Sequence, residues 1–250
     1  ATSSRLDTLV FELGLADSRH KAQALILAGK VLVNDEMVDK CGTRVSISSN
    51  IRLRGEKSRY VGRGGDKLAS VMQLLDIAIE GRIAIDVGSS TGGFTDYLLS
   101  HGAKSVYAVD SGYNQLAHSL RADPRVVVME RTNAKHLAID SFPERPNLLV
   151  MDVSFIGVSK LLPSLLPILK MPADLVILVK PQFELERSQI SKGGVVKEEK
   201  LQLEAVAKVL ESADLLGLQH KATFPCGLTG FKKGNQEYFV HLYYDSSSSD

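Results

Sequence analysis

The feature that most constrains the fold is a regular succession of short apolar segments and helical segments after residue 82. Apolar runs at 83–87, 105–109 and 148–151 alternate with stretches such as 93–102 that have helical character. Apolar strands separated by helices are typical of a parallel sheet covered on both faces. Near the end, "GLQHKATFPCGL" and "NQEYFVHLYY" predict an antiparallel hairpin that closes this sheet. The sequence therefore predicts an α/β fold.

A glycine-rich turn, "GSSTGG" at residues 88–93, follows the first apolar run and precedes a helical segment. A phosphate-binding P-loop requires a lysine after the last glycine, and here Gly93 is followed by Phe94. The dinucleotide fingerprint requires a second glycine where this chain has Ser90. Both phosphate-binding interpretations are therefore disfavoured.

The same turn also satisfies the pattern G-x-S-x-G of a nucleophile elbow, with Ser90 as the nucleophile. Asp152 and then His220 or His241 follow in the order of a hydrolase triad. Against this, the turn follows the first strand of its domain, no HGGG-type segment precedes it, and Asp86 is left without a role. A serine hydrolase is kept as an alternative.

The segment "DVGSSTGGF" resembles the S-adenosylmethionine loop of Rossmann-like methyltransferases. An acid ends the strand, and small residues let the backbone bend around an amino-acid-like ligand. The next strand ends in Asp110, 24 positions after Asp86, a separation typical of a carboxylate that binds ribose hydroxyls. We therefore expect the turn to hold the methionine part of a methyl donor. The predicted donor-binding residues here are Asp86, Gly88, Ser89, Ser90, Gly92, Gly93, Phe94 and Asp110.

Methyl transfer from a sulfonium is an in-line displacement, so the protein must position the nucleophile and, for a hydroxyl, help to remove its proton. Lysines and carboxylates at the carboxyl ends of strands are the candidates for this work. Asp152 and Lys180 each follow an apolar run, and Glu237 opens the last strand. Lys67 lies on the helix that leads into the first strand.

The front of the chain has a different composition from the rest. Residues 1–65 contain 11 Lys and Arg against 7 Asp and Glu, whereas the remainder contains 19 against 22. This asymmetry favours a polyanion as the partner of the front end. Two short helices and small strands are predicted there, and an amphipathic helix over 66–76 follows. We expect a boundary near 58–61, domains at 1–60 and 61–245, and a disordered tail at 246–250.

Composition limits the remaining classes. Hydrophobic residues make up 44% of the chain and charged residues 24%, a mixture typical of a protein with a buried core. The most apolar region is interrupted by prolines, Lys170 and Asp174, so no membrane span is expected. The six histidines show no metal-ligand spacing, so no metal is expected. Cys41 and Cys226 are expected to be reduced thiols in the cytoplasm, or in an organelle matrix if a leader has been removed before Ala1.

Several ordered motifs resemble the TlyA family, which is grouped with FtsJ-like ribose 2′-O-methyltransferases and was historically called hemolysin. They are "DVGSSTGGFTDYLL", "YAVDSGYNQL", "ERTNA", "MDVSFI", "LVKPQFE", "SKGGVV" and "GNQEYF". The resemblance implies a Rossmann-like methyltransferase domain and a catalytic tetrad of Lys67, Asp152, Lys180 and Glu237, with Lys180 activating a ribose 2′-hydroxyl. It also implies that Asp110 and Asp152 lie at the donor site and Asn133 near the donor's adenine.

The front segment "RLDTLVFELGLADSRHKAQALILAGKVLVNDEMV" resembles the S4-type RNA-binding domain, a small α+β module. Its candidate phosphate contacts are Arg5, Arg19, His20, Lys21 and Lys30. The resemblance implies ribosomal RNA or ribosomal subunits as the partner and a cytidine ribose as the methylated position. The historical name leaves a membrane-active hemolysin as a further alternative, which would require an apolar span or a strongly amphipathic helix.

Overall fold

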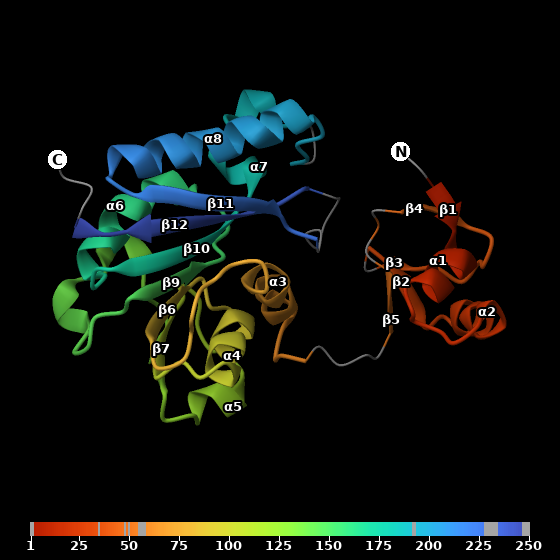
Figure 1. The fold of residues 1–250 in the computed structure, drawn as a ribbon, viewed down its shortest axis with the longest axis horizontal. Coiled ribbons are helices and arrows are strands. Elements are labelled where there is room, and N and C mark those ends of the chain that lie inside the picture. Colours follow the sequence, from red (N-terminus) through yellow and green to blue (C-terminus); the bar gives the residue numbers. More distant parts are fainter. Residues whose placement is uncertain are drawn as a thin grey trace. The chain divides into compact units, whose positions relative to one another are not determined.

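The computed structural model describes residues 3–34, 36–47, 49, 51–54, 59–191, 194–227 and 235–246. The chain divides into two compact units. Of the described residues, those within 3–54 and Gly227 belong to the first unit, and those within 59–226 and 235–246 belong to the second (Figure 1). Of the predicted tail, residues 247–250 lie outside the described residues.

The first unit contains the two predicted helices, α1 (Leu6–Glu12) and α2 (Arg19–Leu27). Ser18 caps α2, as its hydroxyl accepts a hydrogen bond from the Lys21 amide at 3.2 Å. Both helices bury apolar residues in a small core. The strands are β1 (Ser3–Arg5), β2 (Val31–Val33), β3 (Glu36–Met37), β4 (Arg44–Ser46) and β5 (Ile51–Leu53).

Local pattern does not decide every detail of this unit. The two strands within 44–53 do not pair with each other, because β4 pairs with β1 whereas β5 pairs with β2. Helical spacing would continue the apolar face of Leu6, Leu9 and Val10 to Leu13, but α1 ends at Glu12 and Leu13 is exposed. Short strands bury few residues, so tertiary packing decides which partners they take.

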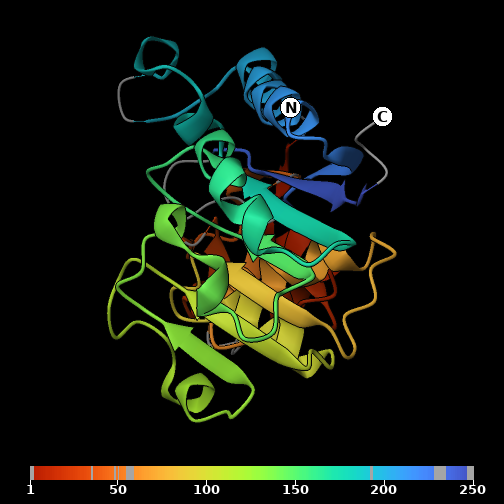
Figure 2. The ribbon, with the colours of Figure 1, turned by 90° about the vertical axis from the view of Figure 1, so that its left-hand side faces the viewer.

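The second unit is built on a seven-stranded sheet with the order β11-β12-β10-β9-β6-β7-β8. Strands β6 to β10 run parallel to one another, β12 pairs antiparallel with β10, and the predicted antiparallel hairpin of β11 and β12 is present at one end (Figure 2). The bounds are β6 (Ile83–Val87), β7 (Ser105–Val109), β8 (Val126–Met129), β9 (Leu148–Met151), β10 (Ala173–Val179), β11 (Gln219–Pro225) and β12 (Tyr238–Tyr244).

Helices cover both faces of this sheet, which explains why its central strands are almost entirely apolar. On one face, the strands share a core with α6 (Leu162–Leu165) and with α8 (Glu199–Leu215), which lies along β11 in Figure 1. On the other face, α4 (Gly93–Ser100) contacts β6 and β7, and α3 (Arg63–Met72) packs against α4. Shorter helical elements are α5 (His118–Arg121), α7 (Pro181–Glu184) and the 3-10 turns η1 (Ala134–His136), η2 (Ile139–Ser141), η3 (Val158–Lys160), η4 (Leu166–Ile168) and η5 (Arg187–Gln189).

Helix α3 begins at Arg63, three residues earlier than predicted. Its first turn contains glycines, which allow α3 to approach α4 closely. A Cβ atom on Gly93 would lie 2.6 Å from the backbone nitrogen of Gly65. The glycines that appeared to precede the helix, Gly64 and Gly65, are therefore its first turn. This contact places α3 directly beside the glycine-rich turn.

Candidate active site

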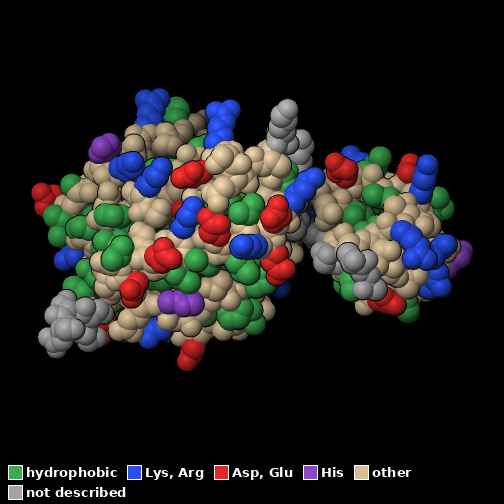
Figure 3. Space-filling view, turned by 90° about the horizontal axis from the view of Figure 1, so that it is seen from above, with side chains coloured by type: hydrophobic (Ala, Val, Ile, Leu, Met, Phe, Trp, Pro, Cys, Tyr) green, Lys and Arg blue, Asp and Glu red, His purple; other side chains and the backbone are tan. Residues whose placement is uncertain are grey.

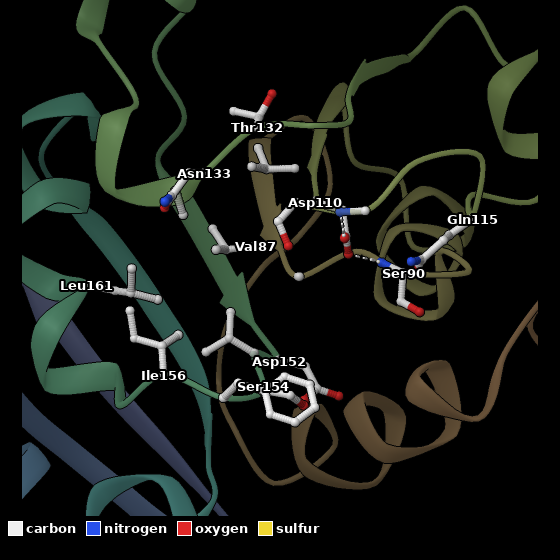
Figure 4. Close-up of a pocket in the computed structure, with 17 residues that line it drawn as sticks. Val87, Ser90, Asp110, Gln115, Thr132, Asn133, Asp152, Ser154, Ile156 and Leu161 are labelled. Atoms are coloured by element: carbon white, nitrogen blue, oxygen red, sulfur yellow. Dashed lines mark hydrogen bonds between the residues drawn. The ribbon is translucent and has the colours of Figure 1, made fainter.

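A cavity of about 490 Å³ opens at the carboxyl ends of β6, β7 and β9, near the turn that follows β8. The strand order reverses beside β6, since β7 and β8 extend the sheet in one direction and β9 and β10 in the other. Ligands of open α/β sheets bind at such a switch point. Figure 4 shows Ser90 and Asp110 at one side of this cavity, Asn133 and Leu161 at another, and Asp152 beside Ser154.

The glycine-rich turn is shaped by positions that accept no side chain. Gly88 has a φ of +86°, and a Cβ atom there would lie 2.3 Å from the backbone oxygen of Asp152. Its amide donates to the Val109 carbonyl at 2.8 Å. The turn is thus held tightly between the ends of β7 and β9. Gly92, also predicted to bind the donor, lines neither described cavity, and a Cβ there would meet the side chains of Leu116 and Leu120.

Asp86 is buried near the end of β6, and only one of its two carboxylate oxygens accepts hydrogen bonds from the described residues. Its Oδ2 accepts hydrogen bonds from the Thr95 amide at 3.0 Å and the Thr95 hydroxyl at 2.7 Å. Its Oδ1 has no hydrogen-bond partner in the described part of the chain. Burial raises the pKa of Asp86 to about 7, although the bonds from Thr95 oppose the shift.

A second, smaller cavity of about 130 Å³ adjoins the first through shared wall residues. It is lined by Gly64, Asp86, Gly88, Ser89, Ser90, Thr91, Gly93, Phe94 and Asp152. The charges of Asp110 and Asp152 contribute to the raised pKa of Asp86. The acidic side chains of Asp86, Asp110 and Asp152 therefore contribute negative electrostatic potential to both cavities, which favours a ligand with positive charge.

Asp110 and Asn133 are held in place by the backbone. The Asp110 carboxylate accepts from the Ser90 amide at 2.8 Å and from the Gly112 amide at 2.6 Å, so it links the turn after β6 to the turn after β7. The Asn133 side chain accepts from the Lys135 amide at 3.0 Å and caps η1. Both residues line the larger cavity, as their predicted roles require.

The four predicted catalytic residues come together as two ion pairs. Lys180 Nζ lies 2.6 Å from Asp152 Oδ1, and Lys67 Nζ lies 2.6 Å from Glu237 Oε2. Lys180 also donates to the Ser154 hydroxyl at 3.0 Å. The topology explains this convergence: β12 runs antiparallel to β10, so that Tyr238 pairs with Val179 and Glu237 enters at the same edge as Lys180.

The two pairs influence each other. Burial alone would lower the pKa of Lys67, but the carboxylates of Glu237 and Asp152 outweigh it and hold the pKa above its ordinary value. Lys67 therefore stays an ammonium group. All four side chains are mostly buried, with exposed fractions between 5% and 22%. The arrangement alternates positive and negative charge beside the larger cavity, which Asp152 also lines.

Phe155 was not among the predicted site residues. Its side chain is 92% exposed, its φ is +70°, and it lines the larger cavity three residues after Asp152. An exposed aromatic residue in a left-handed conformation is strained and poorly packed, which points to a role other than stability. The motif "MDVSFI" contained the residue, but its exposure and conformation are set by the fold.

The hydrolase triad suggested by the G-x-S-x-G pattern is not assembled. His241 lies 2.8 Å from Asp174 at the start of β10, and His220 contacts the Thr223 hydroxyl at 2.9 Å. Asp152 is paired with Lys180. The sequence order was compatible with a triad, but the fold gives each histidine another partner, and this alternative is wrong.

In the part of the chain that the structure describes, none of the helices could span a membrane. Within the same ranges, no group of three or more His, Cys, Asp or Glu residues is placed to hold a metal ion.

In the first unit, two of the predicted RNA contacts are organised by a buried acid. Asp7 accepts from Arg5 at 3.0 Å, from Arg19 at 3.3 Å and from Gln23 at 2.8 Å. The hydrogen bonds from Arg5, with those from Gln23 and Arg19, hold the pKa of Asp7 well below its usual range. Both arginines remain about half exposed.

The other three predicted contacts are exposed, and Lys21 pairs with Asp17 at 2.5 Å. Figure 3 shows basic side chains gathered on the right-hand part, which is the first unit, with a histidine beside them.

Comparisons with known proteins match both units. Residues 60–244 match the model of the FtsJ-like methyltransferases, and residues 4–51 match that of the S4 domain. The 16S/23S rRNA (cytidine-2′-O)-methyltransferase TlyA of Mycobacterium tuberculosis is 42% identical over 97% of this chain and 90% of that protein. Hemolysin A of Brachyspira hyodysenteriae is 41% identical over 95% of this chain and 99% of that protein. A solved structure of a Streptococcus thermophilus protein titled as a hemolysin has a TM-score of 0.76 at 39% identity, covering 98% of this chain and 89% of that one.

Proposed function

The chain belongs to the FtsJ-like methyltransferase family and carries an S4 domain, and on this basis we propose that it methylates a ribose 2′-hydroxyl of ribosomal RNA. The relation to the TlyA proteins, predicted from the motifs, is confirmed by relatives about 40% identical over nearly the whole chain. S-adenosylmethionine is the proposed methyl donor and a cytidine the proposed acceptor. The observation that carries the proposal is the double ion pair of Lys67, Glu237, Asp152 and Lys180 beside the acid-lined cavity.

The residues present fit this donor. S-adenosylmethionine carries an ammonium and a sulfonium charge, and the three carboxylates around the two cavities suit a cation. Asp86 Oδ1, which has no hydrogen-bond partner among the described residues, supports a place for the methionine ammonium group in the smaller cavity. In the larger cavity, Asp110 would bind the ribose hydroxyls and Asn133 would lie at the adenine. A cavity of about 490 Å³ is large enough for most of such a molecule.

The donor, when bound, supplies a methyl group already activated by the sulfonium, so the protein's task is to orient and activate the acceptor. Lys180 would contact the 2′-hydroxyl, with Asp152 and Ser154 fixing its ammonium group. The hydroxyl must lose its proton for the transfer to balance: Lys180 would take that proton as it gives one of its own to Asp152, which would end protonated. Lys67 and Glu237 would maintain the charge balance beside this pair.

RNA as the substrate is supported by features of both units. The S4 match supports RNA binding by the first unit, and Asp7 orients Arg5 and Arg19, whose guanidinium groups would suit phosphate groups. In the second unit, the exposed ring of Phe155 at the larger cavity offers an unstacked base an aromatic surface. His20, Lys21 and Lys30 would add further phosphate contacts.

The test is transfer of labelled methyl from S-adenosylmethionine to small and large ribosomal subunits and to free ribosomal RNA. We expect label in RNA with the wild type, none with Lys180→Ala, and unchanged transfer with Lys170→Ala, which removes an exposed lysine. Calorimetry of donor binding to Lys180→Ala should give an unchanged dissociation constant. Wild-type protein that binds the donor but labels none of these RNAs would contradict the proposed acceptor.

A further inference from the structure

The segment that follows Asp152 contributes much of the site. Val153, Ser154, Phe155 and Ile156 all line the larger cavity, and the Ser154 hydroxyl accepts a hydrogen bond from Lys180. This segment is nevertheless strained at Phe155, whose φ is +70°. Something must therefore hold residues 153–157 in place.

The holding contact comes from the helix that follows Lys180. Glu184, the last residue of α7, accepts a hydrogen bond from the Val158 amide at 2.5 Å through Oε1 and one from the Ser159 hydroxyl at 3.2 Å through Oε2. These donors are the first two residues of η3, so the carboxylate caps this turn. Burial raises the pKa of Glu184, although the hydrogen bonds from Val158 and Ser159 oppose the shift. The carboxyl group is therefore largely removed from water at this cap.

Two neighbouring contacts join the same pair of segments. A Cβ atom on Gly157 would lie 2.8 Å from Glu184 Oε2 and 3.1 Å from the Phe183 carbonyl, so the absence of a side chain at Gly157 favours this close approach. The rings of Phe155 and Phe183 have centroids 5.6 Å apart. The segment after Asp152 is thus attached to the segment after Lys180 on both sides of Gly157.

We propose that Glu184 is a positioning residue for methyl transfer: by capping η3 it fixes residues 153–157 and so holds Ser154 against the ammonium group of Lys180. This inference rests on the proposed function of the site. Glu184 touches neither cavity, and it acts through Ser154. Its place in the motif "LVKPQFE", four residues after Lys180, follows from this task.

The test compares Glu184→Ala with Glu184→Gln in single-turnover methyl transfer, at saturating S-adenosylmethionine, to whichever ribosomal RNA or subunit the wild type labels. A glutamine keeps an oxygen for the Val158 amide and a group that can bond Ser159. We expect the rate to fall by about 10- to 100-fold with alanine and by less than about threefold with glutamine, because small displacements of reacting groups cost this much. Glu211→Gln, an exposed acid on α8, is the matched control and should leave the rate unchanged.

A double-mutant cycle separates positioning from general stability. If Glu184 acts through Ser154, then Glu184→Ala combined with Ser154→Ala should be about as slow as the slower single variant. Ser159→Ala, a milder change of the same cap, should lower the rate less than Glu184→Ala. Rates that multiply independently, or an unchanged rate for folded Glu184→Ala when the wild type is active, would overturn the inference and leave the proposed function intact.

Hydrogen exchange tests the same claim without turnover. In Glu184→Ala, exchange of the Val158 amide and of the amides of residues 153–157 should quicken at least about tenfold, while exchange in the turn at 88–92 stays as in the wild type. Unchanged exchange at 153–158 would refute the inference even if the wild type labelled no RNA. The two failures are therefore distinguishable.

Discussion

The central sheet carries similar charged groups at the two ends of its parallel strands, which are here called the carboxyl edge and the opposite edge. These groups are arranged for different purposes. At the carboxyl edge, Lys180 pairs with Asp152 and Lys67 with Glu237. At the opposite edge, Asp174 at the start of β10 binds Arg82 at 2.6 Å and His241 at 2.8 Å. By strand geometry, the six residue-to-residue steps from Asp174 to Lys180 separate the two groups by about 20 Å. The side chains at the opposite edge are 12% to 16% exposed, so burial does not distinguish them from the tetrad.

The difference lies in what remains unsatisfied. Both oxygens of Asp174 have partners, and although burial alone would raise its pKa, the hydrogen bonds from His241 and Arg82 bring that pKa below its ordinary value. At the carboxyl edge, Asp152 lines both cavities, Asp86 keeps an oxygen without a partner in the described residues, and Phe155 is strained and exposed. Charged groups with all partners present stabilise strand ends, whereas incomplete ones beside a cavity mark a site.

A matched pair of variants, Asp152→Asn and Asp174→Asn, tests whether only the carboxyl edge serves catalysis. Asp152→Asn should slow methyl transfer by about 100- to 1,000-fold, because it removes the charge that holds Lys180. Asp174→Asn should leave the rate of the folded protein unchanged. Single-turnover rates at saturating donor check this, and equal losses in the two variants would mean that both edges serve catalysis.

A second pair tests whether the glycine-rich turn needs close approach or only a permissive backbone. Gly88→Ala adds a Cβ against the Asp152 carbonyl, whereas Gly81→Ala has a similar φ of +73° but nothing within 4 Å. Each should cost about 1–3 kcal/mol of stability. Only Gly88→Ala should also weaken donor binding, by about 10- to 100-fold, equivalent to about 1.4 kcal/mol per tenfold. Calorimetric titration checks this, and equal affinities would count against the placement of the donor.

A substitution at the opposite edge should change the stability of the protein rather than its activity. Asp174→Asn should lower the free energy of unfolding by about 2 kcal/mol, because Arg82 and His241 lose their charged partner. Since the folded pKa of Asp174 lies below its ordinary 3.8, its contribution is present above that pH and is lost as pH falls through the folded value. Denaturant unfolding at pH 7 and pH 3 checks this. A loss of stability that is larger at pH 3 than at pH 7 would contradict it.

The smallest expected effect concerns Asp86. Its folded pKa of about 7 exceeds the ordinary 3.8, so its contribution to stability is complete below that pH and is lost as pH rises through about 7. Asp86→Asn should therefore reduce the fall in melting temperature of the ligand-free protein between pH 6 and pH 8. If the melting temperatures of the variant and the wild type changed equally with pH, the ionisation responsible would belong to a group other than Asp86.

Much of this could be predicted from the sequence. The central strands β6, β7 and β9 are almost entirely apolar. Their alternation with helical segments predicted the parallel sheet, and therefore the shared carboxyl edge of Asp110 and Asp152. The joining of Lys67 to Glu237, 170 residues apart, came from the resemblance, since spacing alone does not reveal such contacts. The roles assigned to individual site residues stay predictions.

Other features depended on three-dimensional packing. Helix α8 was not predicted, although Val206, Val209 and Ala213 supply an apolar face at helical spacing. The early start of α3 followed from glycine contacts between helices. The conformation of Phe155 and the cap by Glu184 depend on two loops whose approach only the folded sheet determines. Local pattern contains no information on such contacts.

If the carboxyl edge directs methyl transfer to a ribose hydroxyl, the product can be identified by mass spectrometry of nucleosides from ribosomal RNA treated with the protein and S-adenosylmethionine. We expect 2′-O-methylcytidine that is absent with Lys180→Ala and present with Lys170→Ala. A methyl group on a base, or a 2′-O-methylated product that persists in Lys180→Ala, would contradict it.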